Sequence, residues 1–275
     1  MHLSDGKGRR IWAGGIETNY HELGFGRTVI LLHGSGPGVS AATNWAKVMP
    51  ALATRFHVLA PDMAGFGYSE RRPDIRYDIK LWVRHLLGFM DALRISQASL
   101  IGNSFGGSLA LAAAARHPDR FSRLVLMGTP CGTFTMTPGL RAGWDYVPDR
   151  EIMRRTMSFF PYDPGTITDE LVEERYQTSL IPGAQEALRQ LLARPEGEGE
   201  TTLSGMPEAA VGAIEHPALV IHGREDLVIP VELGLRLARA MPNADLHVFG
   251  KCGHWVQAER FKPFIALAQL HLADS

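Results

Sequence analysis

The chain has 275 residues, of which 45% are hydrophobic and 21% are charged, and its formal net charge is −1 at pH 7. These values are typical of one large globular α/β domain, or of such a domain with an insertion. The near-neutral charge gives no electrostatic reason to expect a nucleic acid or an anionic membrane as a partner.

Other features narrow the class further. The N-terminal residues contain no apolar core of a signal peptide, and no apolar run is long enough to span a bilayer. The two cysteines, Cys131 and Cys252, lie far apart, and no zinc-type spacing is present. We therefore expect a cytoplasmic protein with no disulfide framework and no metal site.

The first half of the chain alternates predicted strands with predicted helices. Residues 10–12 and 16–23 form a hairpin pattern that turns at Gly14 and Gly15. Further strands are predicted at residues 28–32, 56–60, 98–101 and 124–127, and helices at residues 45–53, 79–93 and 108–115. This alternation predicts a mostly parallel sheet covered by helices on both faces, with functional residues at the carboxyl ends of its strands.

The pattern changes in residues 134–204. Helix-like stretches separated by prolines lie at residues 150–159, 168–179 and 184–192. Residues 196–200, with the sequence EGEGE, have the composition of a solvated hinge. A strand pattern returns at residues 218–222, which favours an insertion over a simple series of core helices. We therefore predict that residues 134–204 form a helical lid and that residues 1–133 and 205–275 form the core domain.

The sequence GNSFGG at residues 102–107 contains Gly-x-Ser-x-Gly between a predicted strand and a predicted helix. This context defines a nucleophile elbow. The sharp turn strains the backbone of Ser104, and the flanking glycines let the strand and the helix approach closely. The hydroxyl stands at a helix N-terminus, where amide dipoles favour negative charge. We predict that Ser104 is a nucleophile; the alternative is an ordinary turn of glycine and serine.

A serine nucleophile needs a base within hydrogen-bond reach, and the base needs an orienting carboxylate. In this type of fold the acid and the histidine follow the serine along the chain. Asp226 follows the predicted strand at residues 218–222, and His254 follows the next one at residues 245–249. We therefore predict a triad of Ser104, Asp226 and His254.

The other acids and histidines fit these roles less well. Glu225 adjoins Asp226, but a neighbour on a turn points elsewhere. Asp62 precedes the serine in the chain, so we interpret it as a loop anchor. We interpret His222 as a packed histidine, and His33 as a structural residue that holds the glycine-rich loop it begins.

Attack on a carbonyl also requires donors for the oxyanion. The backbone N–H of the residue after the nucleophile, Phe105, is the first. We expect the second from the loop after the strand at residues 28–32, at Ser35 or Gly36, because glycines there let the main chain approach the substrate.

These motifs belong together in one known family. They are HGSGPG (33–38), Asn44-Trp45, PDMAGFG (61–67), GNSFGG (102–107), ITDELVEERY (167–176), HGREDLVIP (222–230) and CGHW (252–255). Through them nearly the whole chain resembles the meta-cleavage product hydrolases, which are serine-dependent C–C hydrolases of the α/β-hydrolase fold. Within this family the chain is most similar to the 2-hydroxymuconate semialdehyde hydrolases.

The resemblance implies an eight-stranded, mostly parallel sheet flanked by helices, with an inserted helical lid. It implies cleavage of the C5–C6 bond of 2-hydroxy-6-oxohexa-2,4-dienoates, the ring-opened products of catechols. The products would be 2-hydroxypenta-2,4-dienoate and a carboxylic acid. It further implies that no cofactor is needed, that the partner is this small-molecule dienoate, and that the chain forms a homo-oligomer.

Four substrate-binding residues follow from the resemblance. Arg175 would pair with the dienoate carboxylate, because a guanidinium matches that planar group. Asn44, Asn103 and Trp255 would line the dienoate side. From the sequence alone, Arg175 reads equally well as an exposed helix arginine that makes i,i+4 pairs.

Two other functions share some of these features. A carboxylesterase or another serine hydrolase of the same fold would have the same triad. A non-enzymatic ligand receptor would keep only the fold, and the complete triad argues against it. Ser104 argues against haloalkane dehalogenases and epoxide hydrolases, which have an aspartate at the elbow. We favour an acyl-enzyme, and the C6 substituent stays open between hydrogen, methyl and a larger group.

Overall fold

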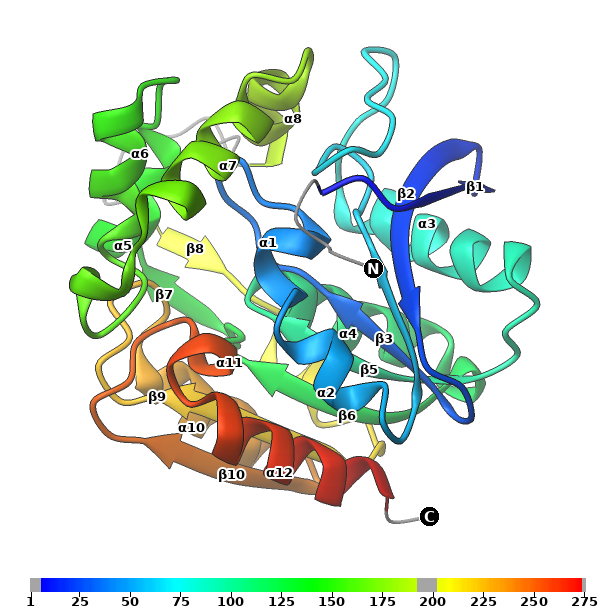
Figure 1. Cartoon of the computed structure of the whole chain (residues 1–275). Coiled ribbons are helices and arrows are strands. Elements are labelled where there is room, and N and C mark those ends of the chain that lie inside the picture. Colours follow the sequence, from blue (N-terminus) through cyan, green and yellow to red (C-terminus); the bar gives the residue numbers. More distant parts are fainter. Residues whose placement is uncertain (1–5, 192–201, 274–275) are drawn as a thin grey trace.

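A sheet of eight strands forms the centre of the computed structural model, which describes residues 6–191 and 202–273. The strands lie in the order β1-β2-β4-β3-β5-β6-β9-β10 (Figure 1). They are β1 (Arg9–Ala13), β2 (Ile16–Leu23), β3 (Thr28–Leu32), β4 (His57–Pro61), β5 (Ala98–Asn103), β6 (Phe121–Met127), β9 (Ala218–Gly223) and β10 (Ala244–Phe249). The pairs β1–β2 and β2–β4 are antiparallel and the other neighbouring pairs are parallel, which confirms the predicted sheet.

Helices cover both faces of this sheet (Figure 1). They include α2 (Val48–Leu52), α3 (Ile79–Ala92), α4 (Phe105–Arg116), α9 (Glu208–Val211), α10 (Val231–Ala240), α11 (Val256–Glu259) and α12 (Phe261–Ala273), and a 3₁₀ turn at Pro118–Arg120. Ile30 and Leu32 of β3 belong to a buried cluster with α3, α4 and α10. Val29 and Leu31 belong to a second cluster with α2 and α12. The alternation of side chains along β3 thus separates two core layers, as expected for a strand buried on both faces.

The helix predicted at residues 45–53 is confirmed only from Val48 to Leu52, as α2, because a separate short helix, α1 (Ala41–Trp45), ends where the predicted helix begins. The Ser40 hydroxyl accepts a hydrogen bond from the Thr43 N–H, which caps α1 and starts it earlier than predicted. Pro50 has no N–H to donate to the carbonyl four residues before it, so the helical ladder is interrupted.

Between β6 and β9 the chain leaves the main sheet. This segment contains β7 (Thr133–Thr135), α5 (Pro138–Trp144), α6 (Arg150–Met157), a 3₁₀ turn (Pro164–Thr166), α7 (Asp169–Ser179), α8 (Ala184–Leu191) and β8 (Thr202–Ser204). Met153, Met157 and Val172 belong to a buried apolar cluster of its own. Its two ends meet because β7 pairs antiparallel with β8 (Figure 1).

The sequence does not predict four elements of this segment, namely β7, β8, α5 and the 3₁₀ turn at Pro164–Thr166. Strands of three residues, such as β7 and β8, are too short to show an alternating pattern. The signal for α5 is present, because Thr137 caps the helix and Pro138 occupies its first turn. The hinge predicted at residues 196–200 lies outside the described residues.

The loop after β4 is held by Asp62, which is fully buried. Its Oδ1 accepts a hydrogen bond from the Ala41 N–H at 2.6 Å. Its Oδ2 accepts from the Tyr68 N–H and from Asn19 Nδ2, both at 2.8 Å. The carboxylate therefore ties α1, β2 and this loop together, which confirms Asp62 as a loop anchor.

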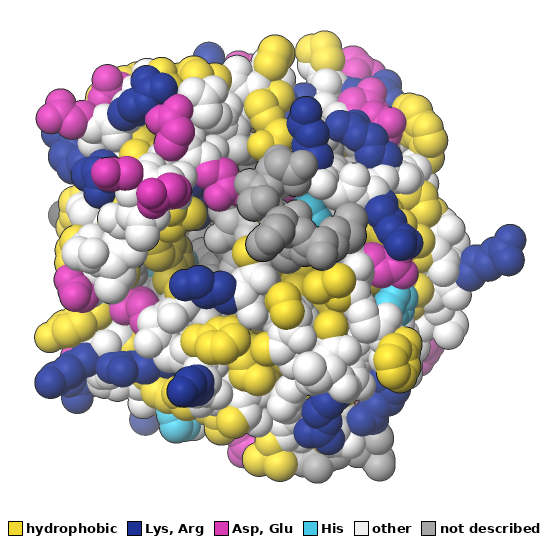
Figure 2. Space-filling view, viewed as in Figure 1, with side chains coloured by type: hydrophobic (Ala, Val, Ile, Leu, Met, Phe, Trp, Pro, Cys, Tyr) yellow, Lys and Arg dark blue, Asp and Glu magenta, His cyan; other side chains and the backbone are white. Residues whose placement is uncertain are grey.

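The surface carries no single-sign field on the face drawn in Figure 2, where Lys and Arg side chains are mixed with Asp and Glu side chains. Among the helices that the structure describes, none is long and apolar enough to cross a membrane. The described ranges also hold no group of three or more His, Cys, Asp or Glu residues that could bind a metal ion.

Close backbone contacts fix α4 against the sheet. A Cβ on Gly106 would lie 2.1 Å from the Leu32 carbonyl oxygen, and a Cβ on Gly102 would lie 2.4 Å from the Gly106 carbonyl oxygen. Real Cβ atoms do not approach backbone oxygens so closely, so only glycine fits at these two positions. The start of α4 can therefore lie directly on β3 and β5, as the elbow motif predicts.

We expect Gly106→Ala to lower the free energy of unfolding by about 1–3 kcal/mol or more, because the methyl group meets rigid backbone. Gly143→Ala is the matched control, since Gly143 lies in α5 and a Cβ there meets nothing within 4 Å. We expect this control to stabilise the protein by about 0.5–1 kcal/mol. Urea unfolding of both variants measures the two effects, and equal stabilities would contradict the packing argument.

Candidate active site

The backbone of Ser104 is strained as predicted. Its φ is 55° and its ψ is −112°, at the junction of β5 and α4. Positive φ is uncommon for a residue with a side chain, and such strain persists only where the surroundings enforce it. The Ser104 N–H donates to the Met127 carbonyl at 2.7 Å, which ties the elbow to the end of β6.

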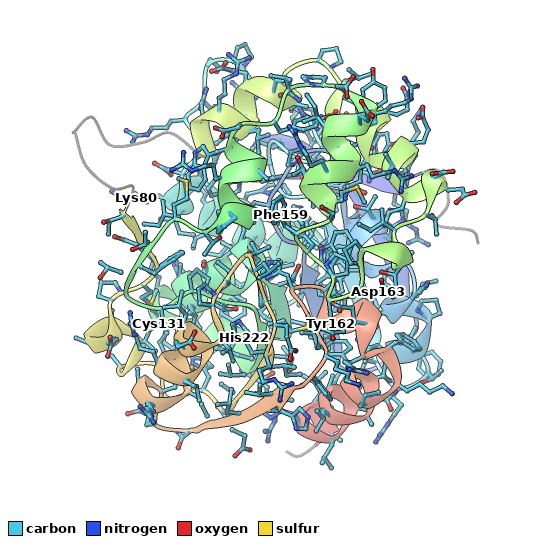
Figure 3. The ribbon with its side chains drawn as sticks, turned by 90° about the vertical axis from the view of Figure 1, so that its left-hand side faces the viewer. Lys80, Cys131, Phe159, Tyr162, Asp163 and His222 are labelled. Carbon is cyan, nitrogen blue, oxygen red and sulfur yellow. The ribbon has the colours of Figure 1, made fainter. Side chains whose placement is uncertain are left out.

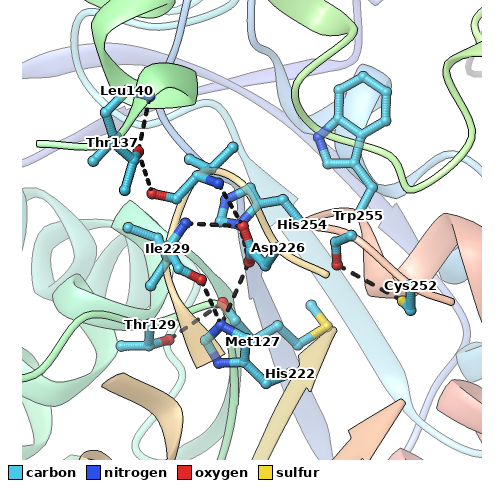
Figure 4. Close-up of polar contacts among 12 residues, drawn as sticks. Met127, Thr129, Thr137, Leu140, His222, Asp226, Ile229, Cys252, His254 and Trp255 are labelled. Atoms are coloured by element: carbon cyan, nitrogen blue, oxygen red, sulfur yellow. Dashed lines mark hydrogen bonds and ion pairs between the residues drawn. The ribbon is translucent and has the colours of Figure 1, made fainter. Parts of the chain in front are cut away.

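Asp226 and His254 form a buried hydrogen-bonded pair (Figure 4). His254 Nδ1 donates to Asp226 Oδ2 at 2.7 Å. Asp226 Oδ1 accepts from the N–H groups of Val228 and Ile229, both at 2.8 Å. With its proton on Nδ1, the neutral His254 ring keeps Nε2 as a base, which is the arrangement that a serine hydrolase needs.

The charged form of Asp226 is the stable one. Burial raises the pKa of this carboxyl group, but the interaction with His254 and the hydrogen bonds from His222 and His254 outweigh burial and hold the pKa well below its usual range. Asp226 therefore stays ionised at neutral pH and can stabilise an imidazolium at His254.

Gly128 brings the elbow and the histidine together. A Cβ at this residue, where φ is +51°, would lie 2.7 Å from His254 Cε1 and 3.4 Å from Asp226 Oδ2. The preceding residue, Met127, accepts the hydrogen bond of Ser104. The pair and Ser104 thus contact the same short stretch after β6. No hydrogen bond joins the Ser104 hydroxyl to His254 among the described residues, and such contacts often tighten only when substrate binds.

The alternative residues have other partners. The carboxylate of Glu225 pairs with Arg224 at 2.7 Å and accepts the Cys252 N–H at 3.1 Å, and within the described part of the chain it forms no hydrogen bond or ion pair with His254. His33 Nδ1 donates to the Gly34 carbonyl at 2.7 Å, and its Nε2 accepts the Met63 N–H at 3.0 Å. Burial lowers the pKa of His33. His33 therefore supports two loops, as predicted.

The predicted oxyanion donors lie on two neighbouring segments. Phe105 is the first residue of α4, where backbone N–H groups have no partner inside the helix. Ser35 and Gly36 lie in the loop after β3, and Gly36 has a φ of +139°. This loop lies against the end of β5, because a Cβ on Gly34 would be 3.0 Å from Asn103 Oδ1. The assignment of these donors stays a prediction.

Arg175 is buried, so its interpretation as an exposed helix arginine is wrong. Its side chain comes from α7, is 4% exposed, and donates from Nη1 to the Pro37 carbonyl at 3.2 Å. The guanidinium carbon lies 5.5 Å from the Trp255 ring centre, within range of a cation–π contact. Burial lowers the pKa of Arg175 to about 10, partly offset by Glu174, so the group stays charged at neutral pH.

This cation has unpaired donors around it. Among the described residues, no carboxylate lies within ion-pair distance of Arg175, and its Nε has no hydrogen-bond partner. Within the same described ranges, the Nδ2 atoms of Asn44, which shares a cavity wall with Arg175, and of Asn103, which like Asn44 contacts Gly34, are also buried without a partner. Buried donors without acceptors cost about 1–3 kcal/mol each. Such a group of donors suits a ligand that carries several acceptor oxygens.

A cavity of about 70 Å³ adjoins this group, and Asn44, Arg175, Trp255 and Gln257 are among its lining residues. A larger cleft of about 500 Å³ shares most of that wall and opens between α1, α7 and α11. Sequence reasoning missed Gln257, which is 4% exposed and whose Oε1 has no partner. No motif marks it, so only its place on the cavity wall could identify it.

The segment between α6 and α7, which Phe159, Tyr162 and Asp163 mark in Figure 3, contacts His254. The His254 N–H donates to the Phe160 carbonyl at 2.6 Å. The Phe160 ring contacts the His254 ring edge-on at 5.6 Å and stacks on Trp255 at 5.3 Å. The insertion therefore contacts the candidate site directly.

Comparison with known proteins agrees with this geometry. Residues 27–261 match the family model of the alpha/beta hydrolase fold, which defines the class of the protein. A 2-hydroxymuconate semialdehyde hydrolase of Pseudomonas sp. strain CF600 is 49% identical over 98% of this chain and 94% of its own. A 2-hydroxy-6-oxo-2,4-heptadienoate hydrolase of Pseudomonas putida F1 is 47% identical over 97% of this chain and 96% of its own.

Solved structures agree as well. The meta-cleavage product hydrolase from Pseudomonas fluorescens IP01 superposes with a TM-score of 0.91 at 43% identity, over 98% of both chains. The 2-hydroxy-6-oxo-6-phenylhexa-2,4-dienoate hydrolase from a Rhodococcus strain gives a TM-score of 0.87 at 29% identity, over 97% of this chain and 99% of its own. The chain therefore belongs to the meta-cleavage product hydrolases of the α/β-hydrolase fold.

If Ser104, Asp226 and His254 act as one unit, single and double losses should be similar. We expect Ser104→Ala and His254→Ala each to lower kcat on the order of 10⁴-fold or more, and the double variant to lose little beyond either one. Ser108→Ala, one turn along α4, makes the same chemical change outside the site and should retain activity. Steady-state kinetics provide the measurement, and losses that multiply in the double variant would argue against the triad.

Proposed function

We propose that this protein hydrolyses the C5–C6 bond of 2-hydroxy-6-oxohexa-2,4-dienoates in the degradation of aromatic compounds. The observation that carries the proposal is a buried Arg175 with no ion-pair partner among the described residues, on a cavity wall that it shares with Asn44 and with Trp255, the neighbour of His254. The same chain holds a strained serine and a buried Asp226–His254 pair. The close relatives, whose names specify such dienoates, support the same substrate class.

Recognition of the substrate begins with its carboxylate. An unpaired charge in a buried site costs several kcal/mol, for the dienoate as well as for Arg175. Bringing the two charges together removes both costs, and a guanidinium can donate two parallel hydrogen bonds to a carboxylate. Asn44 and Asn103 then donate to the 2-oxygen and the carboxylate, and Trp255 lines the dienoate chain.

The chemistry then needs an electron sink for the C–C bond. Loss of the 2-hydroxyl proton and protonation at C5 convert the dienol into a 2,6-diketone, and His254 is placed to transfer the proton. Ser104 attacks C6 while His254 Nε2 takes its proton, and the oxyanion is held by the N–H groups of Phe105 and of Ser35 or Gly36.

Cleavage completes the cycle. The electron pair of the C5–C6 bond moves through C4 and C3 to the 2-oxygen, and the 2-oxygen takes up a proton. The five-carbon fragment then leaves as 2-hydroxypenta-2,4-dienoate. C6 remains bound to Ser104 as an acyl-enzyme. Water, activated by His254, releases it as a carboxylic acid.

The helices of residues 134–204 act as a lid in this proposal. The α7 backbone lies on the oxyanion loop, because a Cβ on Gly38 would be 1.8 Å from the Arg175 carbonyl oxygen. Phe160 covers His254 from the same insertion. The lid would therefore carry the carboxylate-binding residue and exclude water. A cytoplasmic location, expected from the cysteine usage, and a homo-oligomeric state, expected from the family resemblance, complete the proposal.

The substrate class is tested with two substrates. A yellow 2-hydroxy-6-oxohexa-2,4-dienoate should lose its colour rapidly when mixed with the protein, while a neutral nitrophenyl ester should turn over slowly. Rapid ester hydrolysis without bleaching of the dienol would identify the alternative, a carboxylesterase of the same fold.

The same pair of substrates tests Arg175. We expect Arg175→Ala to lower kcat/KM for the dienoate on the order of a hundredfold or more, and to leave the ester nearly unchanged, because the ester brings no carboxylate. Arg175→Lys should recover little, since an ammonium group cannot bind in the bidentate manner. Arg155→Ala removes an exposed arginine of the same insertion and serves as control. An equal loss on both substrates would mean that Arg175 serves the fold alone.

A further inference from the structure

His222 lies next to the catalytic acid, although the sequence indicates only a packed histidine. It is the fifth residue of β9 and is fully buried. Its Nε2 lies 2.8 Å from the Ile229 carbonyl oxygen and 3.5 Å from Asp226 Oδ2 (Figure 4). The acid is therefore in contact with two histidine rings, His254 on one side and His222 on the other.

The contacts of His222 show which of its ring nitrogens carries a hydrogen. A carbonyl oxygen can only accept, so Nε2 carries the hydrogen and donates it to Ile229. Nδ1 is buried with no hydrogen-bond partner among the residues that the structure describes, and a Cβ on Gly234 of α10 would lie 2.4 Å from it. The ring is thus held with its Nε2–H toward the Ile229 carbonyl and with α10 packed closely against its other nitrogen.

The carbonyl that His222 binds belongs to the turn that holds Asp226. The N–H groups of Val228 and Ile229 both donate to Asp226 Oδ1 at 2.8 Å. The carbonyl of Val228 accepts from Thr137 Oγ1 at 2.8 Å, and the carbonyl of Ile229 accepts from His222. The Thr137 hydroxyl therefore fixes the peptide unit that carries the Ile229 N–H, and His222 fixes the next peptide unit, which joins Ile229 to Pro230.

We propose that His222 is a positioning residue for Asp226, an inference that rests on the triad of the proposed function. Its N–H holds the Ile229 carbonyl and limits rotation of Oδ2 away from His254. Without this donor the Ile229 carbonyl is buried and unsatisfied, so the turn shifts to reach another partner. Asp226 then orients His254 less well and stabilises its imidazolium less.

The test compares two substitutions at one position. His222→Gln keeps an N–H that can reach the Ile229 carbonyl, whereas His222→Leu removes it. We expect the leucine variant to lose kcat on the order of tenfold to a hundredfold with little change in KM, because misplacement of about 1 Å is enough for such a loss. The apparent pKa of the acidic limb of kcat/KM should fall, and the glutamine variant should recover most of kcat.

Val220→Ala is the control for effects that come only from a loss of stability. Val220 is buried and lies two residues before His222 on the same face of β9. It should lower the melting temperature and leave the pH profile in place. A leucine variant that resembles Val220→Ala in both respects, or a glutamine variant no better than leucine, would overturn the proposal.

A double-mutant cycle separates this inference from the triad itself. In an Asp226→Asn background, His222→Leu should have almost no further effect on kcat, because the group it positions is gone. If Asp226→Asn is strongly impaired but His222→Leu costs the same factor in both backgrounds, His222 is only structural and the triad stands. If Asp226→Asn alone keeps full activity, the triad assignment fails and the inference fails with it.

Discussion

The contact between Gly106 and the Leu32 carbonyl is the constraint on which the site depends. With 2.1 Å between a Cβ at residue 106 and that oxygen, only glycine lets α4 begin directly over β3 and β5. The chain can then reverse from strand to helix only by placing Ser104 at a positive φ. Ser104 donates a hydrogen bond to the Met127 carbonyl, and the next residue, Gly128, packs against His254. These two contacts fix the position of the serine relative to the base. A tight packing contact thus determines where the nucleophile and the histidine meet.

Two kinds of buried polar group surround that point. Asp226 has every oxygen engaged, by two backbone N–H groups and His254, with His222 nearby, so it is fixed and ionised. A second set of donors is left open: Arg175, Asn44 and Asn103 each have a buried nitrogen that no described residue accepts from. The first set suits a group that must not move during the reaction. The second set suits ligand binding, because the free-energy cost of its buried, unsatisfied donors is removed when an anion binds.

The sequence was sufficient for the sheet, the elbow and the Asp226–His254 pair, because each rests on a local pattern at the end of a buried strand. It failed where tertiary contacts decide: Pro50 and the Ser40 cap divide a predicted helix, and β7 and β8 exist only through their mutual pairing. The burial of Arg175 required the family resemblance, since α7 shows only a weak preference for one face. The sequence does not predict the contacts of His222 or Gln257. No local pattern distinguishes a histidine beside the acid from any packed histidine, or a glutamine on a cavity wall from any other helix glutamine.

The central claim is that the dienoate binds with its carboxylate at Arg175 and its C6 carbonyl at Ser104. A crystal structure of the Ser104→Ala variant soaked with a 2-hydroxy-6-oxohexa-2,4-dienoate tests it most directly. We expect the carboxylate within hydrogen-bond distance of the Arg175 guanidinium, at about 2.7–2.9 Å, and the C6 carbonyl next to residue 104 and the Phe105 N–H. A substrate bound in the reverse direction, or with its carboxylate away from Arg175, would contradict it.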